Sequence, residues 1–359
     1  MTIQQSIDQA KSEAFAEHML GVLNSAALSL MISIGQKTRL FDLMAGLPPS
    51  SSEQIAQAAG LQERYVREWL AAMVTGRIIE YDAASGTYRL PAEHTAWLTR
   101  AAGPNNLAFQ TQYIVLLASV QDEVVECFSK GGGVPYSSFP HFQRLMAEDS
   151  TQVVDASLLQ VTLPLIPGLV ERLQTGIDVA DIGCGGGHAI NVMAQAFPKS
   201  RFVGYDLSQE GIAAALAEAR RLGVTNTRFE VQDVLHLDTP GHYDFITAFD
   251  AIHDQAKPAE VLQAVASALR PAGVFLMVDI AASSHLQENI EHPLAPFLYT
   301  FSCNHCMTVS LALNGAGLGT MWGEQKARQM LNEAGFTQLE VKHVEADFLN
   351  SYYIASKSA

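Results

Sequence analysis

The sequence is poor in cysteine and in basic residues, and both shortages restrict what the protein can be. Four cysteines in 359 residues do not form a disulfide framework, so a disulfide-stabilised fold is excluded and a reducing compartment is indicated. The 22 Lys and Arg residues are outnumbered by 37 Asp and Glu residues, which gives a formal net charge of -15. This field repels phosphate backbones and argues against nucleic acid as the main partner.

The early part of the chain also lacks the patterns of a secretory signal and of a membrane span. Residues 1–15 carry Asp8 and Glu13 and have no basic region before an apolar core, unlike a signal peptide. The most apolar early stretch, residues 19–34, is interrupted by one asparagine and three serines and is too short to cross a bilayer. We therefore expect a cytoplasmic protein with no membrane partner.

Metal-binding patterns are limited to a single pair of cysteines. Cys303 and Cys306 form one CxxC around His305, and no second pair has suitable spacing for a structural zinc site. We expect no bound metal. Since apolar residues make up 48% of the chain and charged residues 16%, the sequence has enough apolar material for a folded enzyme.

Residues 12–100 have the pattern of a winged helix. The predicted elements are helices over 53–59 and 62–75 and strands over 78–81 and 87–90. A helix-turn-helix followed by a hairpin is the winged-helix pattern, which often reads DNA through its second helix. The charges of that helix, among them Arg64 and Arg67, cancel one another. We therefore favour a dimerisation and lid domain over a DNA-reading one.

Residues 107–128, between two glycine-rich breaks, predict one connecting helix.

From about residue 177 onward, β-rich runs alternate with alanine-rich helical runs. The later pattern predicts an α/β fold with a parallel sheet, closed at one edge by an antiparallel C-terminal hairpin. The predicted strands span 177–182, 201–205, 227–231, 243–249, 273–279, 336–343 and 351–356, and the predicted helices span 188–197, 210–222 and 259–269.

A glycine-rich turn follows the first of these strands. It begins with Asp181 and places glycines at 183, 185, 186 and 187, where a parallel sheet forms its ligand crevice. Glycine lets backbone amides approach a ligand closely. The dinucleotide fingerprint would need glycine at 188, but His188 stands there. The sequence therefore argues against a nicotinamide oxidoreductase.

The acidic lead residue and the G-x-G-x-G spacing resemble motif I of class I S-adenosylmethionine methyltransferases. Asp206 ends the second strand, where a carboxylate can accept both ribose hydroxyls of a nucleoside. Asp233 follows the third strand, and the matching acidic residue and the next amide contact adenine in this family. The resemblance implies S-adenosylmethionine as cofactor. The cofactor residues assigned on this basis are Asp181, Gly183, Cys184, Gly185, Gly187, Asp206, Leu207, Asp233, Val234 and Phe249.

Further segments resemble a mycobacterial subfamily of winged-helix methyltransferases. They are residues 250–255, 269–273 and 301–323. The resemblance implies a Rossmann-like class I sheet, a small-molecule acceptor and a homodimer, and the apolar first helix, residues 15–34, also favours dimerisation. The implied division is a winged-helix-like dimerisation and lid domain over 1–100, a helical connector and pocket cover over 101–150, and a catalytic domain over 151–359.

His253 is the first candidate for a catalytic base, because it lies just beyond the fourth strand and an oxygen or nitrogen acceptor must lose a proton. Asp254 could orient its ring. A thioether acceptor needs no base, so the acceptor atom stays open between oxygen, nitrogen and sulfur. A regulator that senses S-adenosylmethionine and binds DNA is the alternative.

Aromatic and histidine side chains on three segments predict apolar walls with a few polar tips around the acceptor. Tyr113 and His141 are the further catalytic candidates among them, and packing between domains is the alternative role for each. His188 is expected to cap the glycine turn or line the methionine end of the cofactor. The other wall residues are Tyr136, Phe139, Tyr299, His305 and Met307.

Overall fold

The computed structural model describes residues 7–345 and 347–357. These residues divide into two compact units at the boundary between Leu116 and Leu117. The predicted connector, residues 101–150, falls on both sides of this boundary.

The first unit confirms the predicted winged-helix elements. Ser51 caps α3 in a reciprocal capping box with Gln54, and Gly60, at φ 66°, ends that helix in the left-handed conformation. Trp69 of α4 is 2% exposed and lies in the core of the unit. The elements are α1 (Gln9–Thr38), α2 (Leu40–Ala45), α3 (Ser52–Ala59), α4 (Glu63–Thr75), β1 (Glu80–Asp82), β2 (Thr87–Arg89), α5 (Ala92–Leu98), η1 (Arg100–Asn105) and most of α6 (Leu107–Ala118).

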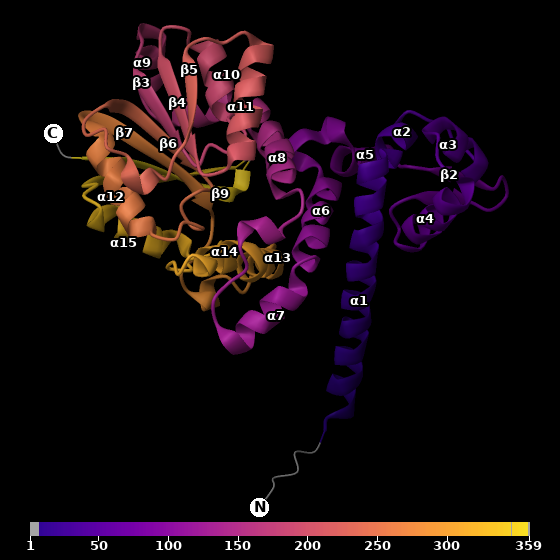
Figure 1. The fold of residues 1–359 in the computed structure, drawn as a ribbon. Helices are drawn as coiled ribbons and strands as arrows, with labels where there is room; N and C mark the ends of the chain where they lie inside the picture. The colour runs from indigo at the N-terminus through magenta and orange to yellow at the C-terminus, as the bar shows by residue number, and fades with distance from the viewer. Residues whose placement is uncertain (1–6, 346, 358–359) are drawn as a thin grey trace, which may run out of the picture. The chain divides into compact units, whose positions relative to one another are not determined.

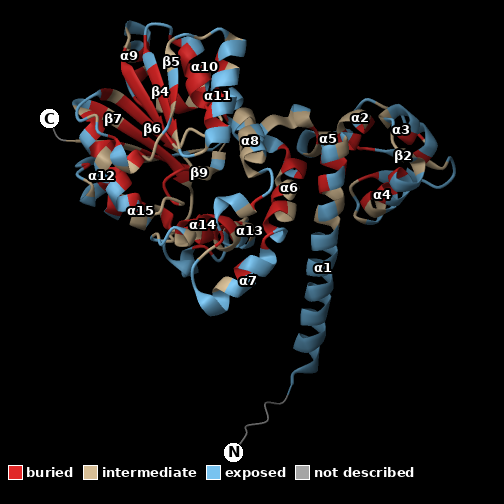
Figure 2. Ribbon diagram, viewed as in Figure 1, coloured by how far each residue is buried: buried red, intermediate tan, exposed pale blue. Residues whose placement is uncertain are grey.

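Helix α1 is longer than the apolar stretch visible in the sequence, and most of its surface is uncovered. Figure 2 shows it exposed over most of its length, with Phe15, Leu20 and Leu23 each at least 60% exposed. By length and composition α1 could cross a membrane, as could the bent pair 142–165 and 169–175 if it formed one span. The expectation of no membrane partner stays a prediction.

The single helix predicted over residues 107–128 is wrong, because the chain forms two helices there. Val120 lies outside the helical region at φ -112° and ψ 10°, and α7 begins at the next residue. Asp122 and Glu123 occupy the first turn of α7, where carboxylates are favoured at a helix N-terminus. The break therefore has a local cause in the acidic pair.

The second unit contains the predicted alternation of strands and helices (Figure 1). Its helices are α7 (Gln121–Lys130), η2 (Tyr136–Ser138), α8 (Phe142–Ser157), η3 (Leu158–Thr162), η4 (Leu163–Leu165), α9 (Leu169–Thr175), α10 (His188–Ala196), α11 (Gln209–Leu222), η5 (Val234–His236), α12 (Pro258–Ala268), η6 (Leu286–Glu288), α13 (Ala295–Phe301), η7 (Ser302–Cys306), α14 (Met307–Ala312) and α15 (Gly323–Glu333). Its strands are β3 (Asp178–Ile182), β4 (Arg201–Asp206), β5 (Thr227–Val231), β6 (Tyr243–Phe249), β7 (Leu269–Ile280), β8 (Gln338–Val344) and β9 (Asp347–Ser356).

These strands form one seven-stranded sheet in the order β5-β4-β3-β6-β7-β9-β8. The first five pair in parallel, while β9 is antiparallel to both β7 and β8. The predicted parallel sheet and antiparallel C-terminal hairpin are confirmed. The carboxyl ends of β3 to β7 therefore meet at one edge, where such sheets bind ligands.

Alternating side chains of the central strands enter two hydrophobic cores. Ala180 and Ile182 of β3 pack in one core with α12 and α15, while Val179 packs in the other with α9, α10 and α11. Figure 1 shows these two groups of helices on opposite faces of the sheet. Burial on both faces fixes the strand register and holds the ligand edge in place.

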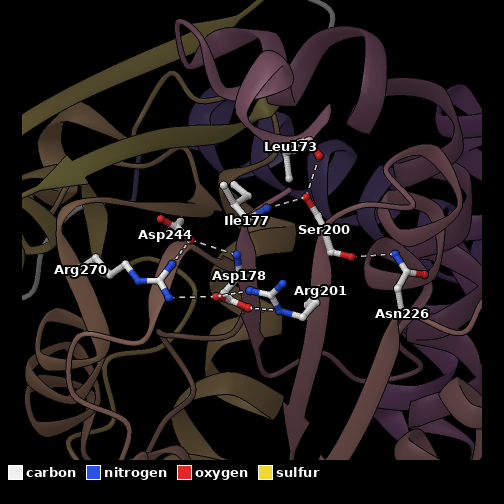
Figure 3. A network of polar contacts seen from close by, with 8 residues as sticks. All are labelled: Leu173, Ile177, Asp178, Ser200, Arg201, Asn226, Asp244 and Arg270. Carbon is white, nitrogen blue, oxygen red and sulfur yellow. Dashed lines mark hydrogen bonds and ion pairs between the residues drawn. The ribbon is translucent and has the colours of Figure 1, made fainter. Parts of the chain in front are cut away.

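A polar network ties together the amino ends of the strands (Figure 3). The carboxylate of Asp178 accepts two bonds from Arg201, at 2.6 and 2.7 Å, and one from Arg270 at 2.9 Å. Arg270 also pairs with Asp244 of β6. Ion pairs thus connect four neighbouring strands at the edge opposite the carboxyl ends.

Candidate active site

The glycine turn after β3 folds back against the end of β4. The amide of Gly185 donates to the Asp206 carboxylate at 2.8 Å, and the amide of Ser208 donates to its other oxygen at 2.7 Å. Gly183 and Gly187 have φ values of 69° and 68°, which favour glycine. A Cβ on either would lie within 2.6 Å of a neighbouring side chain, so this turn needs glycine for both conformation and space.

The carboxylates of this edge differ in burial. Asp181 is 3% exposed and accepts the Thr247 hydroxyl at 2.6 Å, and burial raises its pKa to about 7. Asp206 is only half-buried, and Asp233, after β5, accepts the Leu235 amide at 3.0 Å. Asp181 therefore ties the end of β3 to β6 in the interior, while Asp206 and Asp233 lie nearer the surface.

The remaining assigned cofactor residues complete a surface suited to a nucleoside. Leu207 directly follows Asp206, and its apolar side chain is 60% exposed. Phe249 and Cys184 are half-buried at the same strand ends, and Val234 is buried beside Asp233. Two carboxylates can accept the hydroxyls of a ribose, and an exposed apolar side chain can pack against a flat base. The residues present therefore fit the adenosyl part of S-adenosylmethionine.

His253 follows β6, as the sequence indicates, and is 4% exposed. Its Nδ1 lies 2.8 Å from Oδ1 of Asp279, which also accepts the Trp322 indole N–H at 3.0 Å. Burial disfavours a charged imidazole and lowers the pKa of His253. The Asp279 carboxylate and the Cys306 thiol, which both lie beside the ring, outweigh burial and hold this pKa well above its ordinary value. Asp279 thus fixes the Nδ1 side of the ring, and the Cys306 thiol is a second hydrogen-bonding neighbour of the imidazole.

The expectation that Asp254 orients His253 is wrong, because Asp279 occupies that position. Asp254 instead accepts a hydrogen bond from the hydroxyl of Tyr136. Burial raises the pKa of Asp254, while His253 and the Tyr136 hydroxyl act in the opposite direction. The Asp254 side chain therefore connects the loop after β6 to η2 rather than to the imidazole.

Tyr136 is held in place by a close approach of the preceding glycines to α14. A Cβ on Gly133 would lie 1.9 Å from the backbone oxygen of Thr308, so only glycine fits. The amide of the next residue, Val134, donates a hydrogen bond to the Thr308 hydroxyl at 2.8 Å, which also holds this segment against α14. This contact brings η2 and its tyrosine to the site.

His305 lies inside a cluster of aromatic rings. It stacks on Phe142 with ring centroids 4.1 Å apart and meets Phe139 and Tyr136 edge-on at 4.7 and 5.3 Å. It is 1% exposed, and its Nε2 is buried with no hydrogen-bond partner within the described residues. Burial, helped by His253, lowers the pKa of His305 to about 3, so this imidazole is neutral.

Tyr113 and His141 are the other two predicted catalytic residues. Tyr113 is 2% exposed on α6 in the first unit, where it packs against Phe109. His141 is exposed, with φ 61°, at the start of α8. Their catalytic roles stay predictions. No group of three His, Cys, Asp or Glu side chains in the described ranges is arranged to hold a metal ion.

His188 begins α10 directly after the glycine turn, and its expected role as a cap or at the methionine end of the cofactor stays a prediction. Its Nδ1 lies 3.0 Å from Glu218 of α11, and its Nε2 lies 3.0 Å from Asp155 of α8. Both ring nitrogens are therefore occupied in joining three helices.

The order of the strands and the position of the glycine turn define the class I methyltransferase fold. Two family models match the chain: the Rv2258c-like winged HTH domain over residues 26–100 and a methyltransferase domain over residues 173–347. The chain thus joins an Rv2258c-like winged-helix domain to a methyltransferase domain, as its resemblance implies.

Solved structures share this fold over nearly the whole chain. Human N-acetylserotonin methyltransferase in complex with SAM is 16% identical, with a TM-score of 0.68 and coverage of 99% of this chain and 100% of that one. An O-methyltransferase family protein from Burkholderia thailandensis is 16% identical, with a TM-score of 0.66 and coverage of 96% and 98%.

Curated relatives match a shorter part of the chain. A ubiquinone biosynthesis O-methyltransferase from Leptothrix cholodnii is 31% identical over 104 residues, which are 28% of this chain and 43% of that protein. The chain spans less than half the length of the curated relatives it matches.

Proposed function

We propose that the protein is an S-adenosylmethionine-dependent methyltransferase that methylates a small molecule at oxygen, nitrogen or sulfur. One observation carries this proposal. The glycine turn, Asp206 and Asp233 lie at the ends of β3, β4 and β5, and the His253–Asp279 pair lies at the ends of β6 and β7. The cofactor residues and a buried base are thus adjacent along one edge.

The cofactor supplies an electrophilic methyl group on its sulfonium. Asp206 and Asp233 would hold the ribose and the adenine, and the glycine turn would let the chain approach them closely. Asp279 fixes the ring of His253, whose Nε2 takes the proton from an O–H or N–H acceptor. Tyr136 and the rings around His305 surround the acceptor and exclude water. Positioning of this kind contributes roughly 7–11 kcal/mol to lowering a barrier.

Transfer of labelled methyl from S-adenosylmethionine into a metabolite extract tests the proposal. Products are resolved by mass, and the Asp206→Ala variant serves as control. A labelled small product that is absent from the control supports an enzyme and identifies its acceptor. If the wild type binds no S-adenosylmethionine by calorimetry, the proposal is refuted.

The acceptor atom is then distinguished with His253→Ala. A loss of about a hundredfold or more in kcat indicates an oxygen or nitrogen acceptor, because proton removal contributes about 10²–10⁴-fold. Retention of most of the turnover indicates a thioether, which has no proton to lose.

We also propose that α1 pairs with a second copy of the chain and that the protein is a cytoplasmic homodimer. The support is the apolar surface of α1, where Leu20 and Leu23 are 60% and 65% exposed. Light scattering at micromolar concentration should give twice the chain mass, and Leu23→Glu should give a monomer. A monomeric wild type, or partition of the wild type into phosphatidylcholine vesicles, contradicts this proposal.

A further inference from the structure

The carboxyl edge of the sheet carries more negative charge than its side chains neutralise. Asp250 follows β6 and Asp279 lies near the end of β7, two neighbouring parallel strands. The backbone pairing continues to the Asp250 amide, which donates to the carbonyl of Val278 at 2.9 Å. The two residues are therefore neighbours across the two strands, Asp279 acts electrostatically on Asp250, and His253 is bonded to Asp279.

Each of these carboxyl groups has one oxygen without a partner. Oδ1 of Asp250 and Oδ2 of Asp279 are buried, and neither has a hydrogen bond within the described residues. Asp279 is 0% exposed, and its other oxygen already accepts His253, Trp322 and the Ile280 amide. A buried carboxylate oxygen without a partner is costly unless a ligand supplies a donor or a positive charge.

The surroundings of Asp250 reinforce this charge imbalance. The groups that act most strongly on it are Asp279 on β7, His253 in its own loop, Asp347 on β9 and Asp149 on α8. Only His253 among them can carry a positive charge, and it is engaged by Asp279. Asp250 also has φ 49°, a left-handed conformation that directs the loop away from the strand and that asparagine and aspartate tolerate best.

We propose that the unpartnered oxygens of Asp250 and Asp279 receive the positive charge of the cofactor sulfonium and make the site prefer S-adenosylmethionine to its neutral product, S-adenosylhomocysteine. The proposal rests on the proposed function. Methyl transfer moves the methyl group to the acceptor and leaves an uncharged thioether on the cofactor. The attraction is then lost, so the same pair that favours the charged cofactor weakens the hold on the product.

Proton release accompanies this binding. Burial, with the neighbouring Asp279 carboxylate, raises the pKa of Asp250 to about 8, so most of its population is protonated at pH 7.5 before the cofactor binds. A bound cation favours the carboxylate and expels that proton to solvent. Binding of the neutral product has no such effect.

Calorimetric titration of the full-length protein tests the proposal without an acceptor. S-adenosylmethionine and S-adenosylhomocysteine are each titrated at pH 7.5 in phosphate and in Tris, whose different ionisation enthalpies report proton release. The variant is Asp250→Asn, which keeps the shape and tolerates the left-handed backbone. Asp238→Asn, an exposed position on the same unit, is the matched control for the loss of one charge.

The wild type should bind S-adenosylmethionine more tightly than the product and release more protons with it. In Asp250→Asn the affinity for S-adenosylmethionine should fall about tenfold, equivalent to about 1.4 kcal/mol, and that for the product less than threefold. Asp238→Asn should match the wild type. Equal losses for both ligands, or a wild type that releases the same number of protons with each, overturn the inference.

Two further outcomes are distinguished in advance. If neither ligand binds the wild type, the proposed function itself fails. If Asp250→Asn does not fold, as judged by circular dichroism, sinefungin provides the second measurement on the wild type, because an amine replaces its sulfonium. Sinefungin should then release protons as S-adenosylmethionine does, and release at the level of the neutral product overturns the inference.

Discussion

Replacing Asp279 with asparagine tests the assignment of His253 as a base, since the change removes a charge and keeps the shape. In the protein, Oδ1 of Asp279 accepts His253 Nδ1 at 2.8 Å and the Trp322 indole at 3.0 Å. The oxygen of an asparagine amide can keep only a neutral version of these bonds, and its NH₂ group favours an imidazole that accepts at Nδ1. The ring proton then moves to Nε2, the nitrogen that has to receive the substrate proton.

The expected loss in kcat is about 10²–10⁴-fold, the range that general base catalysis contributes. This corresponds to about 2.7–5.5 kcal/mol in the activation barrier. With S-adenosylmethionine saturating, the acceptor KM should change less than threefold, because Oδ1 of Asp279 holds His253 and Oδ2 is assigned to the cofactor, so neither oxygen binds the acceptor. The Asp279 carboxylate helps to hold the pKa of His253 above its ordinary value, so the neutral base forms only as the pH rises through that raised value. In the variant, the acid limb of the kcat profile should therefore shift to lower pH.

The assay is the initial rate of S-adenosylhomocysteine formation with the acceptor found in the extract experiment, measured from pH 5.5 to 9.5. Trp322→Phe is the control, because it removes the other side-chain donor to Oδ1 and leaves the His253 bond intact. It should lower kcat less than tenfold and leave the acid limb in place. An Asp279→Asn enzyme with kcat within tenfold of wild type and an unshifted acid limb would refute the reasoning for an oxygen or nitrogen acceptor.

Two other predictions concern stability and the aromatic cluster. Asp178→Asn should lower the free energy of unfolding by about 1–3 kcal/mol at pH 7, less than a fully buried pair because Arg201 and Arg270 are 69% and 40% exposed. Burial raises the pKa of Asp178, but the bonds from its two arginines outweigh burial and lower it, so this stability is present above the unfolded pKa and lost as pH falls through the folded one. Urea unfolding at pH 7 and pH 3 should show the difference shrinking, and a constant difference would contradict it. We expect the buried Nε2 of His305, which has no partner among the described residues, to bond the acceptor. His305→Phe should therefore keep the stacked rings and raise the acceptor KM at least tenfold with kcat within threefold, whereas an unchanged KM would exclude this contact.

The fold was predictable because its signals are local. Val179, Ala180 and Ile182 are apolar on both faces of a short strand, and the glycine turn follows at once, so the pattern indicates a buried parallel strand before any tertiary contact is known. The break between α6 and α7 was missed because the apolar spacing continues through Val120, although the acidic pair that begins α7 is visible in the sequence.

The site was predictable only in part, because its pairs join distant residues. His253 was found from its place after a strand, but its partner Asp279 lies 26 residues further along. Asp254 is the nearer carboxylate in sequence and was therefore chosen. The available signal was the acidic residue at the end of β7, since ends of neighbouring parallel strands meet at one edge. The Trp322 contact had no comparable signal, because it depends on how α15 packs.

The position of β9 between β7 and β8 has a consequence for the order in which the sheet is completed. Strand β8 is synthesised before β9, yet its partner in the sheet is β9, and β7 keeps an open edge until β9 arrives. The two late strands can first pair with each other as a local hairpin, which costs little loop entropy, and then dock on β7 as one piece. Until that docking, the strand that carries Asp279 has only β6 beside it. The backbone that holds Asp279 beside His253 therefore becomes rigid in one of the last steps of folding. Amide exchange in β7 should report that step.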